Sequence, residues 1–210
     1  MLFSDEENTL LMAEDAWLLK GYLLGNGQEL LVGLEQVIQQ SPFRHMLTPG
    51  GYSMSASMTN CGSWGWVSDL NGYRYQMDDP ITQSPWSKMP AIFFELAQQA
   101  ANSVGFEHFS PDACLVNRYG VGAKLSLHQD KDETDFSQPI VSFSLGLPAM
   151  FEFGGLTRDA PKKVFLLEHG DVVVWGGKSR LNYHGIRSIK AGSHPVLGEC
   201  RINLTFRRSQ

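Results

Sequence analysis

The spacing of apolar residues predicts two amphipathic helices in the first half of the chain. After Asn26-Gly27, apolar side chains recur at helical spacing at Leu30, Leu34, Val37 and Ile38, which places them on one face of a helix that ends before Ser41-Pro42. A second helix is expected to begin at Pro90, to bury its apolar residues in the same way, and to end at Gly105. Each predicted helix has one apolar face, which must pack against another layer of the fold.

From residue 114 onward the pattern changes to short apolar runs separated by turns that contain glycine or proline, which is typical of β-strands. Strands are expected at residues 140–147, 150–153, 164–167, 171–175 and 201–207. Many short strands with such turns favour two packed sheets. We therefore predict a mainly β fold with flanking helices. Its core would be a jelly roll, or double-stranded β-helix, over about residues 113–208, with the two helices on the outer face of one sheet.

The segment between these regions, from residue 50 to residue 77, is rich in methionine, tryptophan, tyrosine and glycine. It contains Asn71-Gly72 between alternating polar and apolar residues, and this dipeptide is a strong signal for a β-hairpin turn. The pattern alone favours a small satellite core for the aromatic residues.

Composition and charge narrow the functional classes. A length of 210 residues, with 42% hydrophobic and 19% charged residues, suits a single globular domain that spans residues 1–210. The formal net charge of −5 argues against a protein that coats nucleic acid by bulk electrostatics, so any contact with DNA or RNA must be local. A scatter of solvated charges is an equally good interpretation of any one cation. The cations that could form a local patch are Arg158, Lys162, Lys163, Lys124 and Lys131.

The cysteines and the first residues indicate the compartment. Three widely spaced cysteines fit neither a disulfide framework nor a zinc site, so all three are expected to be reduced and packed in the core. The chain opens with the acidic sequence MLFSDEE, whereas a secretory signal begins with basic residues, and no apolar run approaches the length of a membrane span. We therefore expect a cytoplasmic protein with no membrane partner.

The strongest chemical signal is a set of candidate metal ligands. His128 and Asp130 flank one residue, so on an extended segment both side chains point to the same side and can share one ion. Alone, this triplet is more typical of a solvated charged turn. His184 supplies a third ligand from elsewhere in the fold, and two imidazoles with one carboxylate are the set that non-haem Fe(II) oxygenases use. The ligand set suggests iron and a catalytic role for all three residues.

Two arginines near the end of the chain add a site for an acidic molecule. In the sequence RINLTFR, Arg201 and Arg207 lie on one side of a predicted strand with Asn203 and Thr205, whereas the apolar residues face the other side. The two guanidinium groups could hold a short dicarboxylate, because each planar fork binds a carboxylate through two parallel hydrogen bonds. An exposed edge strand that carries charges is the competing interpretation, but it leaves the coincidence with the metal triad unexplained.

These motifs resemble the AlkB family of Fe(II)- and 2-oxoglutarate-dependent dioxygenases, which repair alkylated nucleic acid. The resemblance runs from about residue 41 to residue 208 and is carried by NRY at 117–119, AKLSLHQDKDE at 123–133, His184, and RxNxTxR at 201–207. It implies that the His-Asp-His triad binds Fe(II) and that O2 and 2-oxoglutarate are co-substrates. Arg201 is expected to hold the distal carboxylate and Arg207 to assist at the metal-proximal end. The residues implied to bind the co-substrate are Asn117, Tyr119, Arg201, Asn203 and Arg207.

The resemblance also implies a nucleotide-recognition lid at about residues 41–80, which reverses the interpretation of the aromatic segment as a satellite core. Trp66 and the ring of His128 are expected to stack on the base, and Asp132 to favour a cationic methylated base. Glu133 is expected to lie at the surface. The residues that match substrate-contacting positions are Trp66, Tyr73, Asp132, Arg158 and, mainly as pocket wall, Met58.

The predicted function is therefore oxidative repair of N-alkylated bases, such as 1-methyladenine and 3-methylcytosine, in DNA, with RNA left open. Hydroxylation of the alkyl group would release formaldehyde, succinate and CO2. The expected partner is alkylated DNA that is single-stranded or has a flipped base, and a monomer without an obligate protein partner is sufficient. Two alternatives stay open. One is a 2-oxoglutarate oxygenase that acts on a protein or a small metabolite, and the other is a jelly-roll module that binds a ligand through a metal without turnover.

Overall fold

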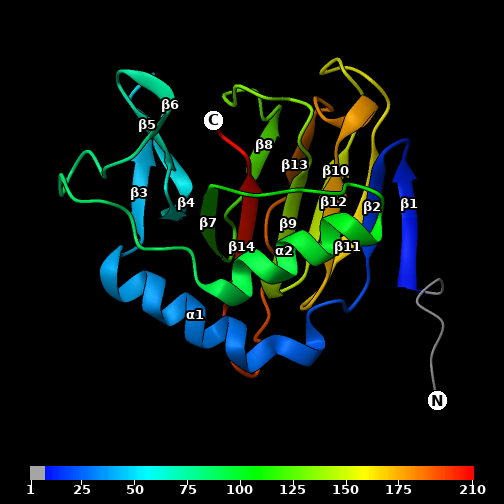
Figure 1. Ribbon diagram of the computed structural model, residues 1–210, viewed down its shortest axis with the longest axis horizontal. Coiled ribbons are helices and arrows are strands. Elements are labelled where there is room, and N and C mark those ends of the chain that lie inside the picture. The colour runs from blue at the N-terminus through cyan, green and yellow to red at the C-terminus, as the bar shows by residue number, and fades with distance from the viewer. Residues whose placement is uncertain (1–7) are drawn as a thin grey trace.

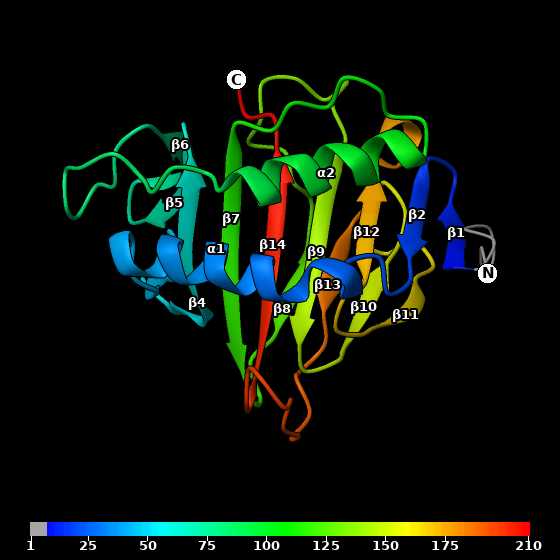
Figure 2. The same ribbon diagram turned by 60° about the horizontal axis from the view of Figure 1, so that its bottom comes forward.

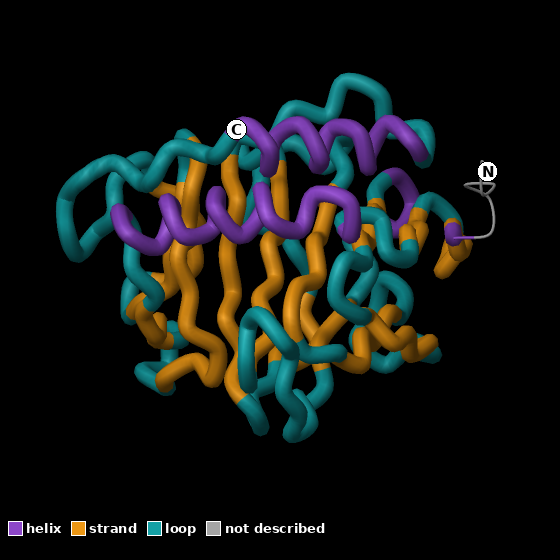
Figure 3. Tube along the Cα trace, turned by 90° about the horizontal axis from the view of Figure 1, so that it is seen from below, coloured by secondary structure: helices purple, strands orange, loops and turns teal. Residues whose placement is uncertain are grey.

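Both predicted helices form, and they lie across the same face of a large β-sheet (Figures 1 and 2). The computed structural model describes residues 8–210. Helix α1 spans Gly27–Gln40, and α2 spans Ala91–Ser103 directly after Pro90. Gly105, with a φ of 88°, follows α2 in the left-handed conformation that glycine adopts most easily. The view from below shows both helices on one side of the strands (Figure 3).

Within residues 8–210, the strands form a large sheet of eight, a smaller sheet of four and a separate pair. The large sheet has the order β1 (Thr9–Ala13), β2 (Ala16–Leu19), β12 (Val172–Trp175), β9 (Ile140–Gly146), β14 (Cys200–Arg207), β7 (Ala113–Gly120), β4 (Ser53–Gly62) and β3 (Arg44–Leu47). The smaller sheet has the order β11 (Lys163–Leu167), β10 (Ala149–Phe153), β13 (His184–Ile186) and β8 (Leu125–His128). The smaller sheet lies behind the large one, on the side away from the helices (Figure 2). This arrangement confirms the predicted mainly β jelly-roll class.

The five strands predicted in the second half all form, each within one residue of its expected bounds. The sequence pattern did not predict β1, β2, β7, β8 or β13. Strand β13 has three residues, which is too short to show an alternation.

Residues 41–80 divide between two sheets. Strands β3 and β4 extend the large sheet beside β7, whereas only β5 (Gly65–Asp69) and β6 (Gly72–Gln76) form a separate hairpin, seen at the upper left of Figure 1. Its turn occupies Leu70 and Asn71, one residue earlier than the predicted dipeptide, and Gly72 takes a φ of 108°. The role of this region as a nucleotide-recognition lid stays a prediction.

Side-chain alternation along the strands divides the buried residues into two apolar clusters. One cluster joins the helices to the large sheet and contains Phe93, Phe143 and Phe206. The other lies between the two sheets and contains Phe151 and Trp175. The second cluster surrounds the site described below.

Two sequence expectations concern the compartment. The three cysteines are free and buried, as predicted. Within residues 8–210, no helix is long and apolar enough to cross a membrane. The acidic segment at residues 1–7, which the sequence analysis compared with secretory signals, lies outside the described residues.

Candidate active site

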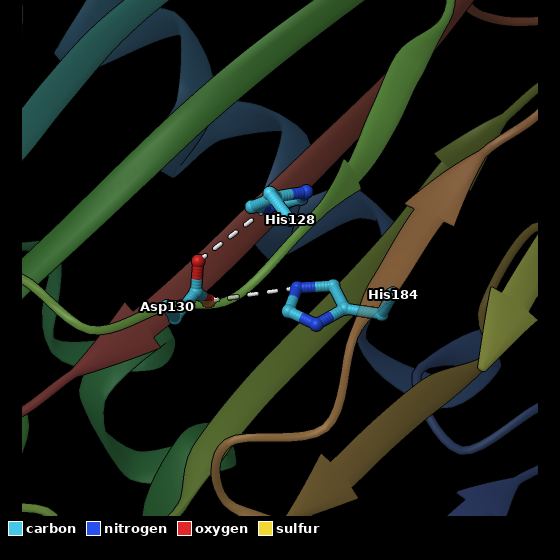
Figure 4. Close-up of side chains that lie close together, drawn as sticks. All are labelled: His128, Asp130 and His184. Atoms are coloured by element: carbon cyan, nitrogen blue, oxygen red, sulfur yellow. Dashed lines mark ion pairs between the residues drawn. The ribbon is translucent and has the colours of Figure 1, made fainter. Parts of the chain in front are cut away.

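The three predicted metal ligands converge between the two sheets (Figure 4). His128 ends β8 and pairs directly with His184, which begins the neighbouring strand β13, while Asp130 follows β8. Nε2 of His128 lies 3.5 Å from Oδ1 of Asp130, and Nε2 of His184 lies 3.7 Å from Oδ2 of the same carboxylate. One atom from each side chain lies within 4.8 Å of the others, so a single ion could contact all three.

Both histidines are oriented with Nε2 toward Asp130. Nδ1 of His128 lies 2.9 Å from the carbonyl oxygen of Ser126, and Nδ1 of His184 lies 3.0 Å from that of Asn182. When Nδ1–H donates to these carbonyls, Nε2 keeps a lone pair for a metal. Burial, together with the nearby His128, lowers the pKa of His184 to about 4. Its imidazole is therefore neutral at pH 7, which is the form that binds metal.

Asp130 is held in its ionised form by Arg207. Nε and Nη2 of Arg207 donate to Oδ2 of Asp130 at 3.1 and 2.7 Å. Burial raises the pKa of Asp130, but Arg207 and the two histidines outweigh burial and hold this pKa well below its usual range. Arg207 therefore lies against the candidate metal ligand, and its expected contact with the co-substrate stays a prediction.

Arg201 has the opposite surroundings, although it is only 1% exposed. Nη2 donates to Oγ of Ser144 at 2.8 Å, while Nε and Nη1 have no partner among the described residues. Burial lowers the pKa of Arg201 to about 10, so the group is still charged at neutral pH. Burying a charged donor costs hydration free energy, and a donor without an acceptor gains no hydrogen bond to offset this cost. Buried unpaired donors are therefore rare in folded proteins. Nε and Nη1 of Arg201 keep hydrogen-bond donors that no described residue satisfies.

One cavity of about 630 Å³ is lined by the triad and by Arg201. It is also lined by the other predicted co-substrate residues, Asn117, Tyr119 and Asn203. Nδ2 of Asn203 donates to Oγ of Ser142 at 2.7 Å, and Oδ1 of Asn117 has no partner among the described residues. Burial raises the pKa of Tyr119 to about 12, so its hydroxyl stays protonated and can donate.

The same cavity is lined by all five residues predicted to contact the substrate: Met58, Trp66, Tyr73, Asp132 and Arg158. The rings of Trp66 and Tyr73 stack with centroids 5.5 Å apart and 15° between their planes. Nε1 of Trp66 donates to Oδ2 of Asp132 at 2.8 Å. Met58 is 3% exposed and belongs to the cluster between the sheets, which agrees with its expected place in the wall.

The predicted cationic patch is divided. Arg158, Lys124 and Lys131 line the cavity, and the guanidinium of Arg158 lies 5.2 Å from the ring centroid of Tyr183. Lys163 instead donates to the carbonyl oxygen of Met12 at 3.0 Å, and Lys162 does not line the cavity. Three of the five predicted cations therefore line the cavity, together with the carboxylate of Asp132.

The expectation that Glu133 lies at the surface is wrong. Glu133 is 6% exposed, its carboxylate pairs with Arg180 at 3.0 Å, and it accepts a hydrogen bond from the hydroxyl of Tyr75 at 2.6 Å. Sequence reasoning missed Arg180, Tyr75 and Ser144. No local pattern marks the first two, whereas Ser144 could have been suspected as a serine in the middle of a fully buried strand.

Comparisons with known proteins agree with this geometry. Residues 15–207 match the family model described as the 2OG-Fe(II) oxygenase superfamily. The chain is 57% identical over 198 residues to the Alpha-ketoglutarate-dependent dioxygenase AlkB of Escherichia coli (strain K12), which covers 94% of this chain and 92% of that protein. The chain belongs to the AlkB family. It is therefore an Fe(II)- and 2-oxoglutarate-dependent dioxygenase that consumes O2, as the sequence motifs predicted.

Other AlkB-family proteins extend the comparison. The mouse protein named Nucleic acid dioxygenase ALKBH1 is 35% identical over 130 residues, which cover 61% of this chain and 33% of that protein. The solved structure entitled "The structure of OsALKBH1" superimposes with a TM-score of 0.81 at 31% identity, covering 95% of this chain and 99% of that one. The predicted family and fold class are thus confirmed.

Proposed function

We propose that this AlkB-family protein removes alkyl groups from N-alkylated bases of DNA, such as 1-methyladenine and 3-methylcytosine, with RNA as a further substrate to be tested. The observation that carries the proposal is the lining of one cavity. It combines the His-Asp-His triad, the unpaired guanidinium of Arg201 and the stacked rings of Trp66 and Tyr73. The relative named as a nucleic acid dioxygenase supports nucleic acid as the substrate class.

Fe(II) would be held by Nε2 of His128, Nε2 of His184 and the carboxylate of Asp130. With O2 and 2-oxoglutarate, the bound iron supplies the oxidation of an alkyl C–H bond, and the products are succinate, CO2 and, after the hydroxylated group is lost, formaldehyde. Arg207 holds Oδ2 of Asp130 and so fixes the direction of the carboxylate. Its ion pair keeps this ligand ionised while burial opposes the charge.

Arg201 would bind the distal carboxylate of 2-oxoglutarate through a guanidinium donor that has no protein partner, since neither Nε nor Nη1 is paired among the described residues. The protonated hydroxyl of Tyr119 and the amides of Asn117 and Asn203 supply neutral polar groups beside it. Ser144 orients the guanidinium from the other side. These residues bind and orient the co-substrate without transferring protons.

A base inside a duplex cannot reach a cavity between two sheets, so the substrate base must be unpaired or flipped out. We propose that it stacks between Trp66 and His128, since an aromatic stacking face is worth about 1–3 kcal/mol per base. Asp132 places a negative charge beside this position, which favours bases that methylation has made cationic. The nucleotides on either side of this base would be contacted by four residues that line the cavity: Tyr73, Lys124, Lys131 and Arg158.

Two finer features belong to the same proposal. The protein would act as a monomer without an obligate partner, because one chain supplies every group that the reaction needs. It would act in the cytoplasm, since the three free cysteines are typical of reducing compartments.

The test is a demethylation assay. Metal-free protein is given Fe(II), 2-oxoglutarate and air with a single-stranded oligonucleotide that carries one 3-methylcytosine, and the oligonucleotide is weighed by mass spectrometry. We expect loss of the mass of one CH2 group, dependent on both iron and 2-oxoglutarate. His128→Ala should abolish it, whereas His108→Asn, at an exposed histidine that lies outside residues 41–80 and does not line the cavity, should not.

Two further arms refine the outcome. A duplex with the same lesion tests whether bases are flipped, and an RNA oligonucleotide tests the second nucleic acid. Succinate formed without demethylation of any oligonucleotide would contradict the proposal and favour a protein or metabolite substrate.

A further inference from the structure

The β5–β6 hairpin is hydrogen-bonded through two side chains to the loop that carries Asp130. Trp66 and Tyr75 lie opposite each other in the two strands of the hairpin. Nε1 of Trp66 donates to Oδ2 of Asp132, and the hydroxyl of Tyr75 donates to Oε1 of Glu133 at 2.6 Å. One cross-strand pair therefore binds two consecutive carboxylates, which begin two residues after a candidate metal ligand.

The two contacts have different surroundings. The Trp66–Asp132 contact is exposed, whereas the side chain of Glu133 is 2% exposed. A hydrogen bond to a buried carboxylate is stronger than one in water, because the local dielectric constant is lower. The Tyr75 contact is therefore the firmer attachment of the hairpin.

Glu133 is connected to Asp130 through two arginines. Arg180 donates from Nη2 to Oε2 of Glu133 at 3.0 Å and from Nη1 to the carbonyl oxygen of Asp130 at 2.8 Å. Arg207 places Nε 3.4 Å from Oε1 of Glu133 and binds Oδ2 of Asp130. Two carboxylates and two guanidinium groups balance one another, so a displacement of Glu133 would disturb both arginines and hence Asp130.

We propose that Glu133 is a positioning residue that couples the docking of the β5–β6 hairpin to metal binding at Asp130, with the Tyr75 hydroxyl as the link. The hairpin matters for bases only if the proposed function holds, but the coupling itself needs no substrate. Because coupling is reciprocal, an ion that fixes Asp130 must stabilise the docked hairpin by the same factor by which docking strengthens metal binding.

The test uses Tyr75→Phe, which removes the hydroxyl and leaves the ring and every ion pair in place. Mn(II) affinity and amide hydrogen exchange of residues 65–76 are measured, the latter with and without Mn(II) and 2-oxoglutarate. In the wild type, we expect the ligands to slow exchange in the hairpin. In Tyr75→Phe, we expect Mn(II) affinity to fall about tenfold, in line with the loss of one hydrogen bond to a charged group, and the ligand-induced slowing to be largely lost.

The matched control is Tyr52→Phe, which removes a hydroxyl from a tyrosine that is 78% exposed, and it should behave like the wild type. Glu133→Gln keeps an acceptor for Tyr75 but removes the charge that faces Arg180 and Arg207, so its loss of Mn(II) affinity should exceed that of Tyr75→Phe.

A hydroxyl with a merely structural role would lower thermal stability and leave the metal response intact. Mn(II) affinity within twofold of the wild type, with an unchanged response of the hairpin, would therefore overturn the proposal. Failure of the proposed function is seen separately, as absence of demethylation by a wild-type protein whose hairpin still responds to the metal.

Discussion

The two faces of strand β14 are equally buried, yet they have opposite chemistry. Ile202, Leu204 and Phe206 belong to the cluster that packs against the helices. The cavity between the sheets is lined by the alternate residues of the strand: Arg201, Asn203, Thr205 and Arg207. Burial stabilises the first face because apolar surface leaves water. It opposes folding on the second face, where each polar group needs a partner. Burial alone therefore does not distinguish a core position from a site position, whereas the partners do.

The two arginines of the cavity face repeat this contrast on a smaller scale. Burial lowers the pKa of Arg207, but Asp130 and the other anionic groups around it outweigh burial and raise it. Arg201 keeps a lowered pKa and two nitrogens without partners. Arg207 thus completes a charge-balanced cluster within the protein, whereas Arg201 keeps donors without partners among the described residues, as the proposed binding of 2-oxoglutarate requires.

The largest expected effect is on the apolar face. Phe206→Ala should lower the free energy of unfolding by about 3–5 kcal/mol, because the ring packs between Phe93 and Phe143 and its removal leaves a cavity. Urea unfolding measures the change, with the exposed Val196→Ala as a control expected to change by less than about 0.5 kcal/mol. The affinity of the folded protein for 2-oxoglutarate should stay near the wild-type value. A large loss of this affinity would show that the two faces of β14 do not have separate roles.

Arg207→Met should come close to this effect from the opposite face. It leaves the carboxylates of Asp130 and Glu133 buried with too little positive charge, which costs roughly 3–5 kcal/mol in comparable clusters. Arg208→Met, at the exposed neighbouring residue, is the matched control and should be nearly neutral in the same urea experiment. A loss below about 1 kcal/mol would show that Arg207 is not needed to balance these charges.

Arg201→Met should separate binding from stability. Loss of two charge-assisted hydrogen bonds predicts a decrease in 2-oxoglutarate affinity of about 100-fold, or about 3 kcal/mol, in titration calorimetry with Mn(II) present. The free energy of unfolding should stay constant or rise, because a buried cation whose only hydrogen bond is to Ser144 is replaced by an apolar chain of similar length. Destabilisation as large as that of Arg207→Met would remove the distinction between the two arginines.

The smallest expected effect is a pH dependence of the free energy of unfolding, which we attribute to His184 in the cavity. His184 has a pKa of about 4 in the metal-free fold against 6.5 as its ordinary value, so between these values the unfolded chain binds a proton that the folded protein does not. The stability of the metal-free protein must therefore fall as the pH falls through this window, by about 2 kcal/mol between pH 7 and pH 5.

His184→Gln should reduce that slope, as measured by urea unfolding at both pH values. Phe206→Leu, on the face that carries no histidine, should keep the wild-type slope. Equal slopes in all three proteins would show that His184 is not the group that titrates.

The helices and the longer strands could be predicted from the sequence because their apolar periodicity is local. The alternation in RINLTFR correctly separated the apolar face of β14 from the face that carries Arg201 and Arg207. The spacing of His128 and Asp130 predicted that both could share one ion, and their ligand atoms do lie together. Strands β8 and β13 have four and three residues, so no periodicity could show that they pair. Their pairing brings His184 to His128.

The sequence by itself thus determined the family, the secondary structure of its longer segments and the residue types of the site. Only the tertiary structure decided which charges are paired. Arg207 and Asp130 are 77 positions apart, Tyr75 and Glu133 are 58 apart, and Arg180 and Glu133 are 47 apart. The physical reason is that periodicity decides which side of an element is buried, whereas the partner of a buried charge comes from whichever distant element packs against it. Glu133 was therefore expected at the surface, and the free side of Arg201 could not be foreseen.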